Sequence, residues 1–233
     1  MRITTIMTLI LGSGLTCGSV AFAASTKDDQ VAMAALQHFN DFIGSWTANG
    51  ESKTGKSEFW KENLSWGWKF NKNAPATLQV EFKDDKTFSK GEMKYLVDKK
   101  LYQLTMTDVN KKTLVFEGKI VRRALELIRI DESNKDKYTL RMSSTNEGAL
   151  MNLEYMLQTG GKGLDKKLYV VMGKKDGVSI SGGKKNECIV SGGVGTIAVS
   201  YNGKTYYVCC GGCRDAFNEN PKKIVDEYLK KKK

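Results

Sequence analysis

Three of the chain's five cysteines lie within five positions of one another, in the segment YYVCCGGCRDAF of residues 206–217. They are Cys209, Cys210 and Cys213, and a fourth, Cys188, precedes Cys209 with twenty residues between the two. Cysteine thiolates bind soft or borderline metal ions such as Cu(I) and zinc. In an oxidising compartment the same four thiols can instead pair as disulfides, in three alternative ways. The residues therefore point either to a metal site or to a disulfide-stapled module.

A β-hairpin explains how the first of these cysteines reaches the others. The stretch TIAVSYNGKTYYV has two alternating apolar segments around Asn202-Gly203. This pair favours a two-residue hairpin turn, because both turn positions need positive φ. The hairpin takes the chain out and back, so it predicts that Cys188 at its base lies near Cys209 at its end.

The segment CRDAFNEN predicts a helix that begins near Cys213 and turns Ala216 and Phe217 inward. Gly211 and Gly212 allow a sharp turn before it. In the first turn of a helix, the macrodipole and the free N–H groups favour a thiolate, which is the form of cysteine that binds metal. The predicted position of Cys213 is therefore suited to a metal ligand.

A second helix is predicted after Asn220, because asparagine is a favoured N-cap and Pro221 a favoured first helical residue. Its apolar face comprises Ile224, Val225, Tyr228 and Leu229. A unit as small as residues 188–233 buries too little apolar surface to be stable without a metal or disulfides. The close spacing of the cysteines is thus expected of a module that a metal or disulfides must stabilise.

The cysteines and the flanking segment NGKTYYVCCGGCRDAFNENPKKIV resemble the YHS domain, also described as the TRASH type of metal-binding domain. The resemblance implies that Cys188, Cys209 and Cys213 are ligands for copper(I) or zinc. Because Cys209 at the strand end and Cys213 at the helix start reach such an ion most directly, we expect Cys210 to be a fourth or exchange ligand. The module is then expected to be treble-clef-like, a hairpin plus helices. One difference is that proline often follows the cysteine pair in that family, where this chain has Gly211.

Two other hypotheses stay open for the cysteines. Disulfides would leave no metal ligands and would make the module a stapled appendage. Cys210 and Cys213 also have the C-x-x-C spacing of thiol-disulfide enzymes, but the βαβ context of those enzymes is not apparent in the sequence.

A long region of period-two polarity, from Trp46 to about Gly173, precedes the module. Segments such as ATLQVEFK, KLYQLTMTD and KTLVFEGKI alternate in polarity, and turn-like links such as KDDK and VNKK separate them. Nine or ten strands with such short links predict an antiparallel meander that closes into a barrel, because closure removes exposed edges. The expected fold class is mainly β with a small α+β module.

The opening Gly44-Ser45-Trp46 resembles the Gly-x-Trp start of the lipocalin-like (calycin) barrels, which implies that fold but no particular ligand. Residues 24–43 predict a short amphipathic helix before it. The apolar residues at helical spacing are Val31, Ala35, Leu36, Phe39, Phe42 and Ile43. Strand aromatics are expected either in the core or around a small apolar ligand; they are Trp60, Trp66, Trp68, Phe82, Tyr95, Tyr102 and Phe116.

The N-terminus has the layout of a secretory signal peptide: Arg2, an apolar run and the small-x-small site Ala21-Phe22-Ala23. We therefore expect residues 1–23 to be a leader that is removed together with Cys17, and the mature protein to be periplasmic or secreted. The expected divisions are then the leader at 1–23, the helix plus barrel at 24–173, a Gly-rich linker at 174–187 and the cysteine module at 188–233. After removal of the leader no membrane span is expected.

The formal net charge of +11 falls to +10 when Arg2 is removed. The lysines are spread along the chain, and only Lys230 to Lys233 form a run, which indicates a solvated surface and no nucleic-acid partner. His38, the single histidine, lies on the leading helix. The sequence therefore lacks the histidine that a catalytic triad, a Cys-His dyad or a haem site on a strand would need. We expect an exported, non-catalytic metal-binding protein that takes copper(I) or zinc and acts in heavy-metal handling or tolerance. The alternative is a carrier of a small apolar ligand with a disulfide-stapled module.

Overall fold

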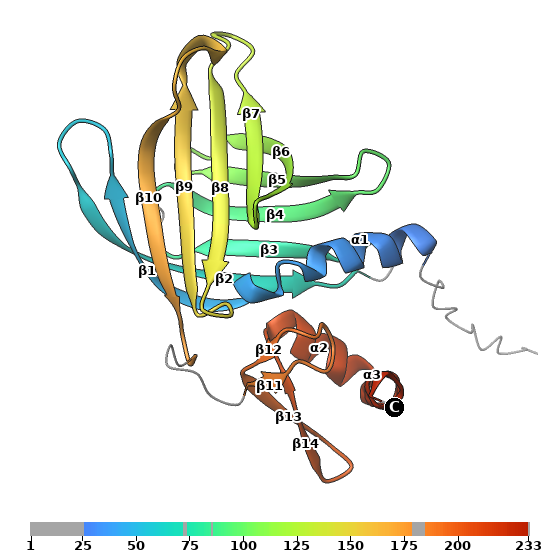
Figure 1. The fold of residues 1–233 in the computed structure, drawn as a ribbon. Helices are drawn as coiled ribbons and strands as arrows, with labels where there is room; N and C mark the ends of the chain where they lie inside the picture. The colour runs from blue at the N-terminus through green and yellow to red at the C-terminus, as the bar shows by residue number, and fades with distance from the viewer. Residues whose placement is uncertain (1–25, 72–73, 85, 179–184, 233) are drawn as a thin grey trace, which may run out of the picture.

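The computed structural model describes residues 26–71, 74–84, 86–178 and 185–232. Ten antiparallel strands form a closed barrel (Figure 1), in which neighbours follow the order of the chain and the first strand pairs with the last. The strands are β1 (Gly44–Ser52), β2 (Phe59–Lys69), β3 (Thr77–Phe82), β4 (Phe88–Leu96), β5 (Leu101–Asp108), β6 (Thr113–Val121), β7 (Ala124–Ile130), β8 (Lys137–Thr145), β9 (Leu150–Gln158) and β10 (Lys166–Lys175). A short helix, η2 (Thr159–Gly161), follows β9. The closed antiparallel barrel expected from the alternating polarity is confirmed.

Side chains alternate between the barrel interior and its outer face, as the pleat of a strand requires. In β2, Glu62, Leu64, Trp66 and Trp68 are buried, whereas the residues between them are partly exposed. The aromatic residues named above contribute to one continuous core. The buried ones are Trp66, Trp68, Phe82, Tyr102 and Phe116. The interior is therefore filled largely by large side chains.

A helix covers one end of the barrel in Figure 1. This helix, α1 (Lys27–Gln37), begins at a capping box in which Thr26 and Asp29 exchange side chain to backbone hydrogen bonds. The hydroxyl of Tyr102 donates a hydrogen bond to the carbonyl of Ala35 at 3.1 Å, which ties the helix to β5. Val31, expected on the apolar face, is exposed, because the face that meets the barrel is one residue further on, at Ala32.

The turn η1 (Asn40–Phe42) leads into β1 and closes the floor of the barrel at Trp46. The indole N–H of Trp46 donates to the carbonyl of Phe42 at 2.7 Å. The ammonium of Lys175, at the end of β10, lies 5.0 Å from the centre of the Trp46 ring and donates to the carbonyl of Asp41 at 2.6 Å. These contacts fasten the first and last strands to the covering segment.

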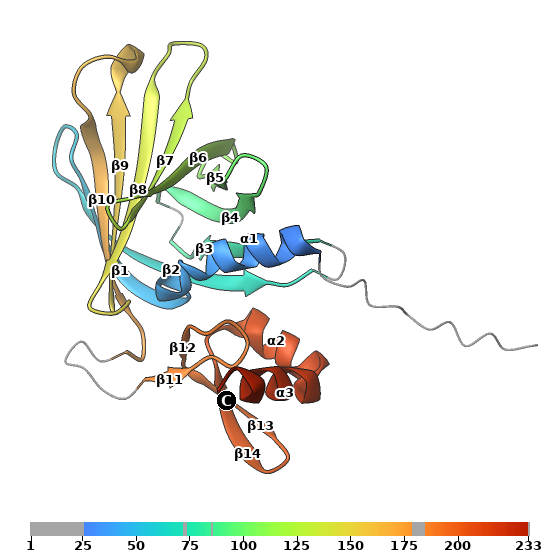
Figure 2. The same ribbon diagram turned by 45° about the vertical axis from the view of Figure 1, so that its right-hand side comes forward.

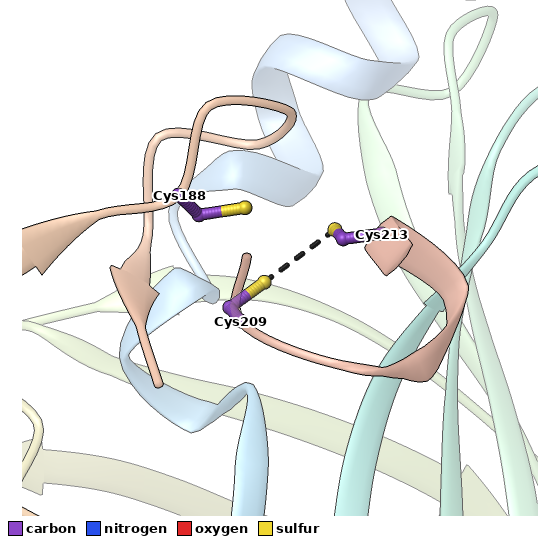
Figure 3. A group of neighbouring side chains, drawn as sticks. All are labelled: Cys188, Cys209 and Cys213. Atoms are coloured by element: carbon purple, nitrogen blue, oxygen red, sulfur yellow. Dashed lines mark hydrogen bonds between the residues drawn. The ribbon is translucent and has the colours of Figure 1, made fainter. Parts of the chain in front are cut away.

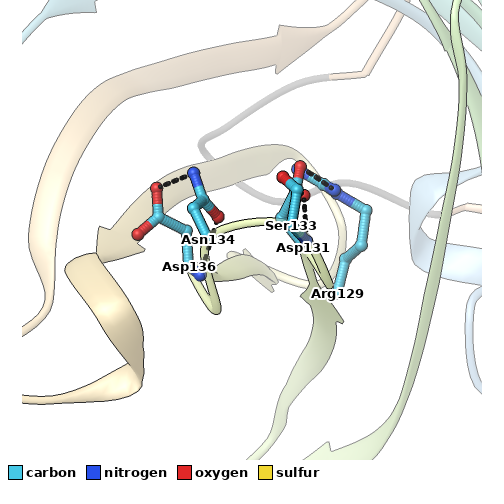
Figure 4. Close-up of polar contacts among 5 residues, drawn as sticks. All are labelled: Arg129, Asp131, Ser133, Asn134 and Asp136. Carbon is cyan, nitrogen blue, oxygen red and sulfur yellow. Dashed lines mark hydrogen bonds and ion pairs between the residues drawn. The ribbon is translucent and has the colours of Figure 1, made fainter.

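In the loop that follows β7, neighbouring residues form hydrogen bonds with the loop's carboxylates (Figure 4). Asp131 accepts hydrogen bonds from the hydroxyl of Ser133 at 2.6 Å and from its backbone N–H at 3.2 Å, and Arg129 forms an ion pair with it at 3.3 Å. Asp136 accepts from the side chain of Asn134 at 2.9 Å. The Ser133 contacts, followed by that of Arg129, lower the pKa of Asp131 to about 2. The carboxylates of this loop are engaged in holding its shape.

The cysteine-containing module comprises two strand pairs and two helices: β11 (Asn186–Glu187) with β12 (Val194–Gly195), β13 (Ile197–Tyr201) with β14 (Lys204–Val208), α2 (Gly211–Glu219) and α3 (Pro221–Lys231). Asn202 and Gly203 have φ values of 49° and 71°, which confirms the predicted hairpin turn. The side chain of Asn220 caps α3 by accepting from the N–H of Lys223, also as expected.

One detail of the module differs from expectation. Gly211 and Gly212 are the first residues of α2, with Cys210 as its N-cap, so they do not form a separate turn before the helix. The helix therefore begins two residues earlier than predicted, and Cys213 still lies in its first turn.

The module lies against the covered end of the barrel, beneath α1 and β2, in both ribbon views (Figures 1 and 2). The last barrel strand continues to Lys175, two residues past the expected boundary. Residues 179–184 of the predicted linker and the whole predicted leader, including Cys17, lie outside the described residues. In the described part of the chain, no helix has the length and apolar character needed to cross a membrane.

Candidate metal centre

The four cysteines of the module come from four different local settings. Cys188 follows β11, Cys209 follows β14, Cys210 is the N-cap of α2 and Cys213 is in the first turn of that helix. A parallel bridge between Cys188 and Tyr207 sets the start of the module beside the returning hairpin strand. This pairing places Cys188 close to Cys209, as the hairpin argument predicted.

Cys188, Cys209 and Cys213 form a three-sulfur cluster, in which all three sulfur atoms lie within 4.8 Å of one another (Figure 3). The Sγ atoms of Cys209 and Cys213 are 3.5 Å apart. All three side chains are buried, and the three cysteines are free thiols. Within the described residues, this is the group of histidine, cysteine or acidic side chains with the geometry to hold a metal ion.

Cys210 is not a member of the three-sulfur cluster, although its sulfur is 3.9 Å from that of Cys209. It is also a free thiol and is slightly exposed, at 8%. Its sulfur accepts a hydrogen bond from the backbone N–H of Trp68 in β2 at 3.4 Å. The structure thus separates the two adjacent cysteines, with Cys209 in the cluster and Cys210 held by the barrel.

A tight turn after Cys188 surrounds its sulfur with polar groups. The N–H of Cys188 donates to the carbonyl of Gly193 at 2.7 Å, and the N–H of Gly192 donates to the carbonyl of Cys188 at 2.9 Å. Ser191 in this turn contacts two sulfurs: its N–H donates to Cys188 at 3.5 Å, and its hydroxyl lies 3.3 Å from Cys209. The contacts with Ser191 favour the charged thiolate of Cys188.

Hydrogen bonding among the sulfurs divides the thiols into two classes. Hydrogen bonds from Cys209 lower the pKa of Cys188 and that of Cys210 well below the ordinary value of a thiol. Cys209 and Cys213 act mainly as the proton-bearing partners, so hydrogen bonding to Cys188 raises the pKa of each. Cys188 and Cys210 are therefore the thiols that hydrogen bonding favours as thiolates, and metal binding releases the protons that the other ligands carry.

Lys175 supplies positive charge at the edge of the site. Burial lowers the pKa of its ammonium to about 8, and the nearby Asp41 and Cys209 oppose that shift. A buried cation beside a group of thiols offsets part of the negative charge that deprotonation would leave there. Sequence analysis did not find this residue, because it lies in the barrel strand β10.

The barrel and the module meet through specific backbone contacts. A Cβ atom at Gly212 would lie 1.8 Å from the carbonyl oxygen of Trp68, so only glycine permits α2 to approach β2 this closely. The side chain of Asn40 donates to the carbonyl of Ser191 at 2.8 Å and accepts from the indole N–H of Trp68 at 3.2 Å. The cysteines of the candidate metal site therefore all come from the module, and contacts with the barrel segment fix their position.

A pocket of about 660 Å³ lies between the two parts. Its cysteine lining is Cys209 and Cys210, and its barrel side includes Gly67, Trp68 and Lys175. Of the three clustered sulfurs, Cys209 alone belongs to the lining. The single histidine, His38, is exposed at the end of α1 and takes no part in the cluster.

Sequence reasoning missed the residues outside the cysteine segment that contact the sulfurs, Ser191 and Trp68, and Asn40, which contacts those two residues. Ser191 could have been suspected from the Ser-Gly-Gly turn that follows Cys188. The contacts of Trp68 and Asn40 had no local signal, because they depend on how the module docks on the barrel.

No protein-family model matches the chain, and no curated protein matches it either. Among solved structures, that of Rv2717c from M. tuberculosis is similar at a TM-score of 0.37 and a sequence identity of 12%. The match covers 61% of this chain and 97% of that one. A similarity at this level carries no argument about function.

Proposed function

We propose that this chain is a non-catalytic metal-binding protein that holds one copper(I) or zinc ion on the thiolates of Cys188, Cys209 and Cys213. The observation that carries the proposal is the convergence of three buried free thiols, from three separate elements, within 4.8 Å of one another. Buried cysteines that only fill a core have no reason to point their sulfurs at one common centre.

The sulfur spacing fits a bound ion. A metal–sulfur bond of about 2.3 Å implies about 3.8 Å between two sulfurs of a tetrahedral site and about 4.0 Å in a trigonal one. The 3.5 Å between Cys209 and Cys213 needs only a small expansion to reach either value. Three clustered thiolates favour copper(I), because zinc in structural sites takes four ligands. Zinc would have to recruit Cys210 from its contact with Trp68.

The main alternative is a disulfide-stapled module. Two disulfides would draw the four sulfurs into two separate pairs, each about 2.0 Å apart. A group of three sulfurs with the fourth held by the barrel supports metal binding better than it supports two pairs.

The carrier alternative for the barrel has less support. The strand aromatics that could have lined a ligand cavity lie in the core or pack against it, and Tyr95 and Tyr102 contact each other at 5.0 Å between ring centres. We therefore propose that the barrel acts as a scaffold for the module.

The finer assignments of fold are part of the same proposal. The order of turn, hairpin and helix around the cysteines supports a treble-clef-like module of the YHS/TRASH type. The position of Gly44-Ser45-Trp46 at the start of β1 supports a lipocalin-like barrel. We further propose that the protein is exported, on the strength of the leader pattern alone, and that it acts in metal handling or tolerance.

Metal analysis combined with a thiol count tests the proposal. The mature chain should be purified from its native compartment without chelator, and its metal content and free thiols measured before and after removal of the metal. About one ion per chain, with four titratable thiols in the apoprotein, is the expected result. Absence of metal together with absence of free thiols would support the disulfide-stapled appendage instead.

A further inference from the structure

The pocket between barrel and module does not reach the four cysteines equally. Cys209 and Cys210 line it, whereas Cys188 and Cys213 are outside its lining. Cys188 and Cys213 are exposed by only 1% and 0%, so they lie on the closed side of the site. An ion that enters from the pocket therefore meets Cys210 or Cys209 first.

Cys210 is placed to act between the pocket and the cluster. It lies outside the three-sulfur cluster, yet its sulfur is only 3.9 Å from that of Cys209. The backbone N–H of Trp68 donates to the same sulfur from the barrel side. An ion bound to Cys210 can thus be shared with Cys209 before it reaches the other two ligands.

The size and the walls of the pocket indicate what can carry the ion. Its volume of about 660 Å³ is in the range of small-molecule sites, which is about 300–1,000 Å³. The strand β2 bounds it on one side and the start of α2 on the other, and a small carrier fits between them. Lys175, Asp176 and Glu81 add charges of both signs to the lining, as suits a small zwitterionic molecule.

We propose that this pocket is a port in which a low-molecular-weight thiol delivers copper(I), with Cys210 as the first protein ligand. The inference rests on the metal site proposed above. The sulfur of Cys210, which accepts a hydrogen bond from Cys209, binds copper as the bond to one carrier thiolate breaks. Cys209 sulfur then binds the copper as the bond to Cys210 breaks, and the proton that Cys209 releases passes to the departing carrier thiolate. The copper stays in the +1 state throughout.

Gly67 provides a way to narrow the port without touching a cysteine. It lies on β2 facing the module, and a Cβ atom there would be 3.8 Å from the Cβ and 3.9 Å from the Sγ of Cys210, which is ordinary contact distance. The larger side chain of Gly67→Val should therefore extend over Cys210. Thr205→Val is a matched control, because Thr205 is exposed on the hairpin and does not line the pocket.

The experiment mixes the reduced apoprotein with the copper(I)–glutathione complex under anaerobic conditions and follows thiolate-to-copper absorbance by stopped flow. Gly67→Val and Cys210→Ser should each slow uptake by about tenfold or more, whereas Thr205→Val should match the unmodified chain. Equilibrium affinity, measured against a competing chelator, should change by no more than about threefold. Circular dichroism checks that each variant is folded.

Each result has a distinct meaning. Uptake at the unmodified rate by folded Gly67→Val overturns the port. If that variant does not fold, the isosteric Cys210→Ser decides the question alone. A loss of affinity in Cys210→Ser as large as that in Cys209→Ser would make Cys210 an equilibrium ligand and would also overturn the port. Failure of the unmodified apoprotein to take up any copper would instead reject the proposed function.

Discussion

The backbone of Trp68 holds Cys210 and Gly212 at once: its N–H donates to the sulfur of Cys210 at 3.4 Å, and its carbonyl oxygen faces the Cα of Gly212. One peptide segment of the barrel thus fixes the start of α2, from which Cys213 projects into the three-sulfur cluster. The contact leaves no space for a Cβ atom at position 212.

Gly212→Ala should separate the module from the barrel. Its new methyl group would meet the carbonyl oxygen of Trp68 at 1.8 Å, so the helix must shift, at a cost of about 1–3 kcal/mol. Gly211→Ala is the matched control, because a Cβ atom there has nothing within 4 Å. Thermal unfolding should show a lower Tm for Gly212→Ala only, and equal Tm values for the two variants would contradict the contact.

Substitution of single cysteines should separate cluster members from Cys210. Cys188→Ser, Cys209→Ser and Cys213→Ser should each lose most of the bound metal, because each removes one of three ligands from a buried site. Cys210→Ser should retain most of it. Metal content after dialysis against a weak chelator measures the difference. Equal loss in all four variants would indicate a four-thiolate zinc site, and no loss in any would end the metal-binding proposal.

Trp46→Phe should weaken the floor of the barrel. The substitution removes the indole N–H that donates to the carbonyl of Phe42 at 2.7 Å, and it leaves that carbonyl buried without this donor. A loss of about 2 kcal/mol in the free energy of unfolding is expected, measured by urea denaturation. The control Phe59→Leu, at a side chain that is 75% exposed, should change it by less than about 0.5 kcal/mol. Similar values for the two variants would show that the Trp46 hydrogen bond contributes little.

Ser133→Ala should raise the pKa of Asp131 from about 2 toward its ordinary value, since the Ser133 contacts are the main cause of the shift. A carboxyl group whose pKa is lowered by folding stabilises the fold above the pKa of the unfolded chain, which is about 3.9. That contribution is lost as the pH falls from there toward 2. Carboxyl-detected NMR titration measures the shift. Asn134→Ala, which affects Asp136 instead, should leave the pKa of Asp131 unchanged.

The barrel could be predicted from sequence because the strands carry their own signal. Alternation in the segment of residues 150–158, for example, predicts a strand with the bounds that β9 has, Leu150–Gln158. The closing pair could be inferred only from the general need to remove edges, since nothing in β1 identifies β10 as its partner. Helical spacing was less informative in α1, where Val31 and Ala32 both fit an apolar face and only packing distinguishes them.

The three-sulfur cluster could be partly predicted from sequence, because the hairpin turn at Asn202-Gly203 brings Cys209 back to Cys188. The roles of Gly211 and Gly212 could not be predicted from the sequence. Glycine at a turn and glycine at a close backbone approach look alike in a sequence, and Trp68, which distinguishes them, is more than a hundred positions away. The pocket likewise depends on two surfaces that only the docked structure brings together.

The pairing of β1 with β10 has a consequence for the order of folding. Thr47 in β1 pairs with Lys174 in β10, and its hydroxyl donates a hydrogen bond to Asp176, just past the end of β10, across 129 positions of the chain. Closing so long a loop is slow relative to forming the hairpins within it. The floor on which the module docks is complete only after that step, so in refolding the port should form last, and a lag in copper uptake behind the recovery of β-sheet signal would reveal it.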